Sequence, residues 1–143
     1  MGKCFHTTTV KAPVDQVWSA LANFHDFGWA AGVIETCEKV GDAGASEVGA
    51  KRLLNGAIHE TLASVDADNH RLTYTIDDGP APLNSGAVTR YTGEVELCPI
   101  TTGGGTFIKW TSSYETADDV AVGEFCNPVY AALMGCLQAH FGE

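Results

Sequence analysis

The chain opens with Cys4-Phe-His-Thr-Thr-Thr-Val10 and continues directly into Lys11-Ala-Pro-Val-Asp-Gln-Val-Trp-Ser-Ala-Leu21. We interpret the first run as a strand and the second as a helix. Pro13 suits the first turn of a helix, where a backbone N–H would have no intrahelical partner, and Asp15 places a negative charge near the positive end of the helix dipole. Apolar side chains then recur at three- and four-residue spacing, at Val14, Val17, Trp18 and Leu21. This spacing predicts an amphipathic helix, and a second apolar turn, Asn23–Trp29, follows it.

The middle of the chain is a series of strand-like runs separated by turn signals. Asn55-Gly56 is the strongest of these signals, because both residues tolerate the positive φ of a type I′ hairpin turn. The only long irregular stretch runs from Asp77 to Gly86. The predicted strands are Val33–Val40, Val48–Leu54, Ala57–Val65, Arg71–Ile76, Ala87–Leu97 and Thr106–Tyr114.

The hydrophobic period becomes helical from Asp119 to Phe141. Acidic residues precede the segment and Gly142 can end it, as expected for a long C-terminal helix. Pro128 removes the hydrogen bond to the Glu124 carbonyl, so we expect the helix to bend or break between these two residues.

Composition limits the possible functions. The chain has 143 residues, which suits a single domain, and a net charge of −10 with only eight Lys and Arg residues. Nucleic acids and anionic membranes attract clustered basic residues, so neither is an expected partner. No apolar run reaches the roughly 18–20 residues of a membrane span, and no signal-peptide core begins the sequence.

Cysteine and histidine usage points to a reduced protein without a metal. The five cysteines are an odd number without a Cys-x-x-Cys pair, and the five histidines form no His-x-x-x-His pair. We therefore expect free thiols, a cytoplasmic location, and neither a metal nor another cofactor.

Short motifs occur in a characteristic order along nearly all of the chain: Ala12-Pro13-x-Asp15-x-Val17-Trp18, Phe24, Trp29, Val48-Gly49-Ala50-x-Arg52, Glu60-Thr61-Leu62, Asp66, Leu72-x-Tyr74, Trp110–Tyr114 and Leu133-x-x-x-Leu137. Taken together, they resemble the START-like or Bet v 1-like superfamily, and in particular its polyketide cyclase/dehydrase group. The resemblance implies an α+β helix-grip fold. In this fold a curved seven-stranded antiparallel sheet surrounds a long C-terminal helix, two short helices close one end, and a ligand cavity lies between.

Within the superfamily, the chain is similar to plant receptors of the abscisic acid class and to bacterial cyclase-like proteins. The receptor resemblance implies cavity positions for Glu60, Tyr91 and Ser112. Two receptor features are missing. Asn55-Gly56 stands where the receptors have a longer gate loop, and the position of the receptor lysine that pairs with the ligand carboxylate corresponds to the region of Ala31 in this chain. We therefore do not expect hormone sensing.

Strand alternation predicts which side chains share the cavity. If Glu60 points inward, its strand neighbours two residues away do too, and the corresponding phase of later strands is apolar and aromatic. Such a surface is typical of a small-molecule pocket on the order of several hundred Å³. The predicted ligand-binding residues are Trp29, Ile58, Glu60, Leu62, Tyr74, Tyr91, Trp110, Ser112, Phe125 and Tyr130.

Glu60 admits three interpretations. An isolated carboxylate on an apolar face is costly, so its pKa would be raised, and with Tyr91 it could perform acid–base catalysis. It could instead contact a ligand. It could also form a cross-strand ion pair with Arg52 on the adjacent hairpin strand, without a chemical role.

Three functions remain open. The first is binding or carriage of a hydrophobic small molecule, such as a lipid, polyketide or terpenoid. The second is a cyclase or dehydratase that uses Glu60 and Tyr91 as acid and base. The third is binding of another protein through the sheet or the lid. The lack of a nucleophile–base pair or a cofactor motif favours the first.

Overall fold

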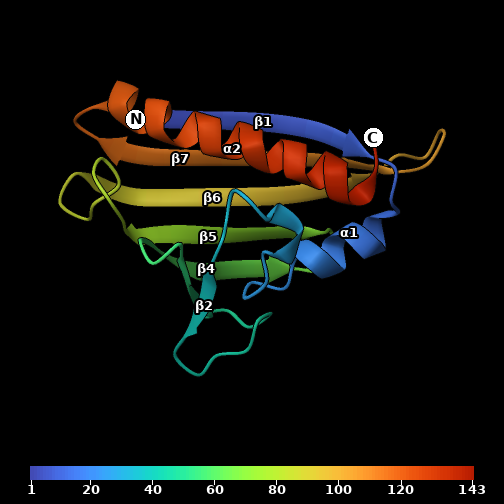
Figure 1. The fold of residues 1–143 in the computed structure, drawn as a ribbon, viewed down its shortest axis with the longest axis horizontal. Coiled ribbons are helices and arrows are strands. Elements are labelled where there is room, and N and C mark those ends of the chain that lie inside the picture. Colours follow the sequence, from blue (N-terminus) through green and yellow to red (C-terminus); the bar gives the residue numbers. More distant parts are fainter.

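The computed structural model describes residues 1–143 as one antiparallel sheet and the helices that pack on it (Figure 1). The seven strands follow the order β1-β7-β6-β5-β4-β3-β2, so the first strand lies beside the last and all other neighbours are consecutive. The strands are β1 Gly2–Val10, β2 Cys37–Val40, β3 Lys51–Leu54, β4 Ile58–Asp66, β5 Arg71–Asp78, β6 Val88–Pro99 and β7 Thr106–Thr116. The predicted helix-grip fold is confirmed.

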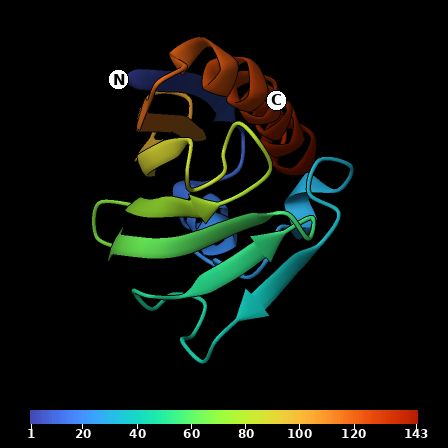
Figure 2. The ribbon, with the colours of Figure 1, turned by 90° about the vertical axis from the view of Figure 1, so that its left-hand side faces the viewer.

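The long helix α2, Asp119–Phe141, lies across one side of the curved sheet and packs against β1 and β7 (Figures 1 and 2). Its side chains that face the sheet are buried because the apolar stripe repeats at helical spacing. By length and mean hydropathy (1.4 over 18 residues) α2 would also suit a membrane span, so the expectation that no apolar segment reaches this length is wrong for α2. In this fold its buried face belongs to the core: Val122, Cys126, Tyr130, Leu133, Met134, Leu137 and Phe141.

Pro128 does not divide α2, so the predicted break is wrong. Pro128 and Glu124 both lie on the exposed side of the helix. Water can therefore donate a hydrogen bond to the Glu124 carbonyl in place of the missing backbone amide. Packing of the opposite face of the helix against the sheet keeps α2 continuous.

The short helices close the end of the sheet opposite the N-terminus, but only one of them is an α-helix (Figure 1). In α1, Val14–Leu21, Val17 and Leu21 are buried, as the spacing predicts. The second is η1, Gly28–Ala30, a single 3-10 turn that buries Trp29 and packs against α2.

The Asn55-Gly56 turn joins β3 to β4 as predicted, with φ of 52° and 64°. The Asn55 side chain has a second role that the turn signal does not reveal. Its Oδ1 accepts hydrogen bonds from the amides of Glu35 (2.7 Å) and Thr36 (3.2 Å), and its Nδ2 donates to the Val33 carbonyl. These bonds occupy the backbone of residues 33–36, so the expected strand Val33–Val40 is limited to its last four residues.

Candidate functional site

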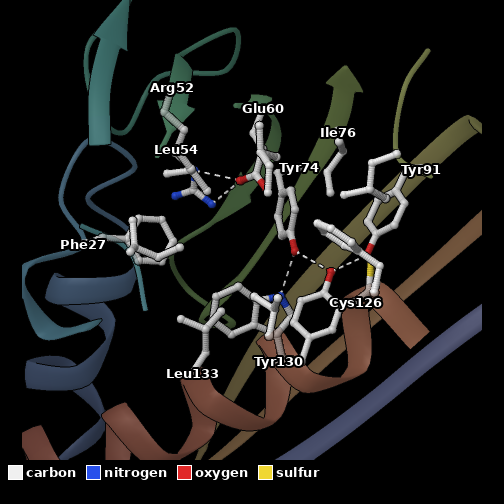
Figure 3. Close-up of a pocket in the computed structure, with 16 residues that line it drawn as sticks. Phe27, Arg52, Leu54, Glu60, Tyr74, Ile76, Tyr91, Cys126, Tyr130 and Leu133 are labelled. Carbon is white, nitrogen blue, oxygen red and sulfur yellow. Dashed lines mark hydrogen bonds and ion pairs between the residues drawn. The ribbon is translucent and has the colours of Figure 1, made fainter. Parts of the chain in front are cut away.

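A small cavity lies between the concave face of the sheet and α2 (Figure 3). Its volume is about 40 Å³, and 14 of its 16 lining residues are hydrophobic. A water molecule occupies about 30 Å³ of liquid, and a cavity that binds benzene measures about 150 Å³. The predicted volume of several hundred Å³ is therefore wrong for this conformation, because large aromatic side chains fill most of the space.

At one end of the cavity, Arg52 of β3 and Glu60 of β4 form a buried ion pair across the hairpin (Figure 3). Arg52 donates from Nε (2.8 Å) and Nη2 (2.6 Å) to Glu60 Oε1, and from Nη1 (3.2 Å) to the Phe24 carbonyl. The guanidinium carbon also lies 3.7 Å from the centre of the Phe24 ring and 4.5 Å from that of Phe27. These rings shield the charge from water while their faces attract it.

Burial raises the pKa of the Glu60 carboxyl, and the Arg52 guanidinium opposes that effect only in part. A buried ion pair is costly to desolvate, so its members depend on each other for stability. This geometry matches the ion-pair interpretation of Glu60. The side chain nevertheless lines the cavity, so a ligand could still reach it.

The other end of the cavity holds a chain of hydroxyl groups from three elements (Figure 3). Tyr130 of α2 lies between Tyr74 of β5 and Tyr91 of β6, with oxygen–oxygen distances of 3.1 Å and 2.5 Å. Trp110 of β7 extends the chain, because its Nε1–H donates to the Tyr74 hydroxyl at 2.9 Å. Burial raises the pKa of all three tyrosines well above the ordinary value of 10.0, so they stay protonated at neutral pH.

Gly93 allows the Tyr74 ring to lie close to the backbone of β6. The two residues face each other across the β5–β6 ladder, and a Cβ on Gly93 would lie 2.1 Å from Cζ of Tyr74. Only glycine leaves room for this approach. The hydroxyl chain therefore depends on a residue that has no side chain.

The thiol of Cys126 borders the cavity beside the tyrosines (Figure 3). Burial raises its pKa to about 11, so it is protonated and a poor nucleophile at neutral pH. All five cysteines are free, and no group of three or more His, Cys, Asp or Glu side chains could hold a metal ion.

The structure brings most of the predicted site residues together. Seven of the ten line the cavity: Ile58, Glu60, Tyr74, Tyr91, Trp110, Phe125 and Tyr130. Trp29 instead borders a separate space of about 10 Å³ that Trp110 also lines, and Leu62 and Ser112 are buried outside the cavity wall. The predicted acid and base, Glu60 and Tyr91, share no hydrogen bond and are each bonded to another partner.

Sequence reasoning did not find several lining residues. Leu83 belongs to the irregular β5–β6 loop, yet only 3% of its surface is exposed. Ile34 and Phe27 belong to the loops around η1, where no strand period applies. One available signal was that Leu83 is the one large apolar residue in the otherwise polar, glycine- and proline-rich stretch Asp77–Gly86.

Comparison with known proteins agrees with this architecture. A family model described as "Polyketide cyclase / dehydrase and lipid transport" matches residues 1–142. The chain belongs to this family. The resemblance inferred from the motifs is thus confirmed, and membership supports hydrophobic ligand binding in general terms.

Solved structures of other proteins have the same fold. A protein from Nitrosospira multiformis is 41% identical, with a TM-score of 0.93 over 99% of this chain and 97% of the other. The protein XoxI from Bacillus cereus is 21% identical, with a TM-score of 0.78 over 99% and 96%. Ginseng major latex-like protein 151 from Panax ginseng is 14% identical, with a TM-score of 0.80 over 99% and 98%. A comparison with curated protein sequences finds no match.

Proposed function

We propose that this family member binds or carries an apolar small molecule, of lipid, polyketide or terpenoid type, between the sheet and α2. The observation that carries the proposal is the cavity itself, which has an apolar wall and a few fixed polar groups at its ends. Ligand pockets in proteins commonly have this composition. The free thiols suit a reducing compartment, and we place the protein in the cytoplasm.

Entry of a ligand requires the cavity to expand. Four lining side chains are only half buried, and they can change rotamer at a lower cost than the enclosed aromatic residues. They lie on β4, β5 and α2: Ile58, Ile76, Phe125 and Val129. We expect the bound ligand to take the space that these side chains now occupy.

Binding is favoured over acid–base catalysis by the state of the two candidate catalytic groups. Arg52 Nε and Nη2 both donate to the same Glu60 carboxylate oxygen. Protonation of Glu60 during acid–base catalysis would therefore leave the guanidinium charge unpaired in an apolar site. Tyr91 has a pKa raised far above neutrality by burial, so its phenolate is not available as a base.

Native mass spectrometry of freshly purified protein tests the proposal. We expect a bound small molecule, and we expect Val129→Glu to lose it because the new carboxylate would enter the apolar wall. Val120→Glu is the matched control, since Val120 lies on the same helix, is 68% exposed and is outside the cavity. Protein without bound molecules that also fails to take up any added apolar compound would contradict the proposal.

A further inference from the structure

The hydroxyl chain contains more protons than its contacts can use. Trp110 Nε1 is only a donor, and each tyrosine hydroxyl carries one proton. Trp110, Tyr74, Tyr130 and Tyr91 therefore supply four protons for three contacts. Whichever way the hydroxyls rotate, one proton has no acceptor within the chain.

The surroundings offer no strong acceptor for that proton. Next to Tyr91 lies the Cys126 thiol, whose sulfur accepts hydrogen bonds only weakly. Ser112, a neighbour of Tyr91, and Trp29 do not relieve the excess, because Ser112 Oγ and Trp29 Nε1 are buried and each brings a proton of its own. The buried polar groups around the aromatic side chains therefore include at least one N–H or O–H donor more than their contacts use. A buried donor without a partner is costly, because it loses its hydrogen bond to water and gains none in return.

We propose that the ligand presents a neutral carbonyl oxygen to the Tyr74–Tyr130–Tyr91 hydroxyl chain. This inference rests on the proposed function and narrows it from apolar molecules in general to ketones, esters or quinones with an apolar body. A carbonyl oxygen is an acceptor without a proton, so it satisfies the leftover donor and adds no new one.

A carboxylate would be a poorer occupant than a neutral carbonyl. The Arg52 guanidinium is already paired with Glu60 and enclosed by Phe24 and Phe27, so no free cation faces the hydroxyl chain. The Glu60 charge also acts on Tyr74, where it contributes to the raised pKa of that phenol. A second buried anion would therefore be repelled and unpaired.

Three probes of one size test the proposal: acetophenone, ethylbenzene and benzoate. Calorimetry or NMR titration of the whole protein gives the Kd of each. A single net hydrogen bond of ordinary strength corresponds to about tenfold in affinity, so we expect acetophenone to bind about tenfold tighter than ethylbenzene. We expect benzoate to bind most weakly.

The carbonyl band of bound acetophenone supplies an independent readout. A hydrogen bond lowers its infrared frequency relative to an apolar solvent, and the triple variant Tyr74→Phe/Tyr91→Phe/Tyr130→Phe should abolish this shift. Tyr114→Phe is the control, because the Tyr114 hydroxyl contacts Cys4 and lies outside the chain. If the triple variant does not fold, the wild-type band and the probe series still decide the question.

The outcomes separate the two proposals. Equal binding of acetophenone and ethylbenzene, or tightest binding of benzoate, would overturn the carbonyl inference and leave apolar binding intact. Failure of all three probes to bind would overturn the carbonyl inference, and it would count against the proposed function as well if the purified protein also carries no bound molecule.

Discussion

Replacement of Glu60 by glutamine should destabilise the protein strongly, because Arg52 would keep its charge in a site that is 5% exposed. Removal of one member of a buried ion pair costs about 3–5 kcal/mol. The amide oxygen of glutamine can still accept from the guanidinium, and the Phe24 carbonyl at 3.2 Å remains, so we expect the lower end, about 3 kcal/mol. For a chain of this length that corresponds to a decrease in Tm of about 10 °C.

Glu96→Gln provides the matched control in the same urea and thermal unfolding experiments. Glu96 also pairs with a basic residue, Lys109, at 3.2 Å, but the two side chains are 30% and 34% exposed. Exposed pairs contribute about 1 kcal/mol or less. If Glu60→Gln were no more destabilising than Glu96→Gln, the ion-pair account would be wrong. Unchanged stability with loss of a bound ligand would instead assign Glu60 to ligand recognition.

Three further substitutions test individual steps of the account. Gly93→Ala should cost about 1–3 kcal/mol in urea unfolding, because the new Cβ displaces the Tyr74 ring; a neutral result would show that the close approach is not required. Pro128→Ala should stabilise the protein by about 1 kcal/mol, because an amide donor returns to the Glu124 carbonyl; a decrease in Tm would contradict the view that the proline is merely tolerated. Hydrogen bonds from the amides of Ser85 and Gly79 lower the pKa of Asp78 below its ordinary value of 3.8. The ionised Asp78 side chain therefore contributes to folding stability above that ordinary value, and this contribution is lost as the pH falls through the folded-state pKa. Asp78→Asn should therefore reduce the loss of Tm between about pH 5 and pH 3, and identical acid profiles would refute this.

The helix-grip arrangement was implied by the family resemblance, whereas the individual helices, turns and strand faces could be predicted because their signals are local. Pro13 and Asp15 mark the start of a helix, Asn55-Gly56 fixes a hairpin, and strand alternation assigns Tyr74 and Tyr91 to the inner face. Each of these depends on backbone geometry or on a period of two, which tertiary contacts did not override.

The detail of the site could be predicted only in part, because it depends on side-chain packing. Alternation places Glu60 on the inner face but cannot choose between a ligand and Arg52 as its partner. Cavity volume depends on how large rings fill the space, and Tyr74 fills it only because Gly93 lies beneath. Leu83 was missed because a loop has no period from which burial can be read.

The indole N–H signals of the three tryptophans test the central claim most directly. Trp110 lines the cavity and bonds to Tyr74, whereas Trp18 packs against His70 outside it. In a ¹H–¹⁵N NMR titration with acetophenone, the account predicts that the Trp110 indole signal shifts saturably while the Trp18 signal stays in place. A saturable shift of Trp18 without a shift of Trp110, or no saturable shift at all, would contradict binding between the sheet and α2.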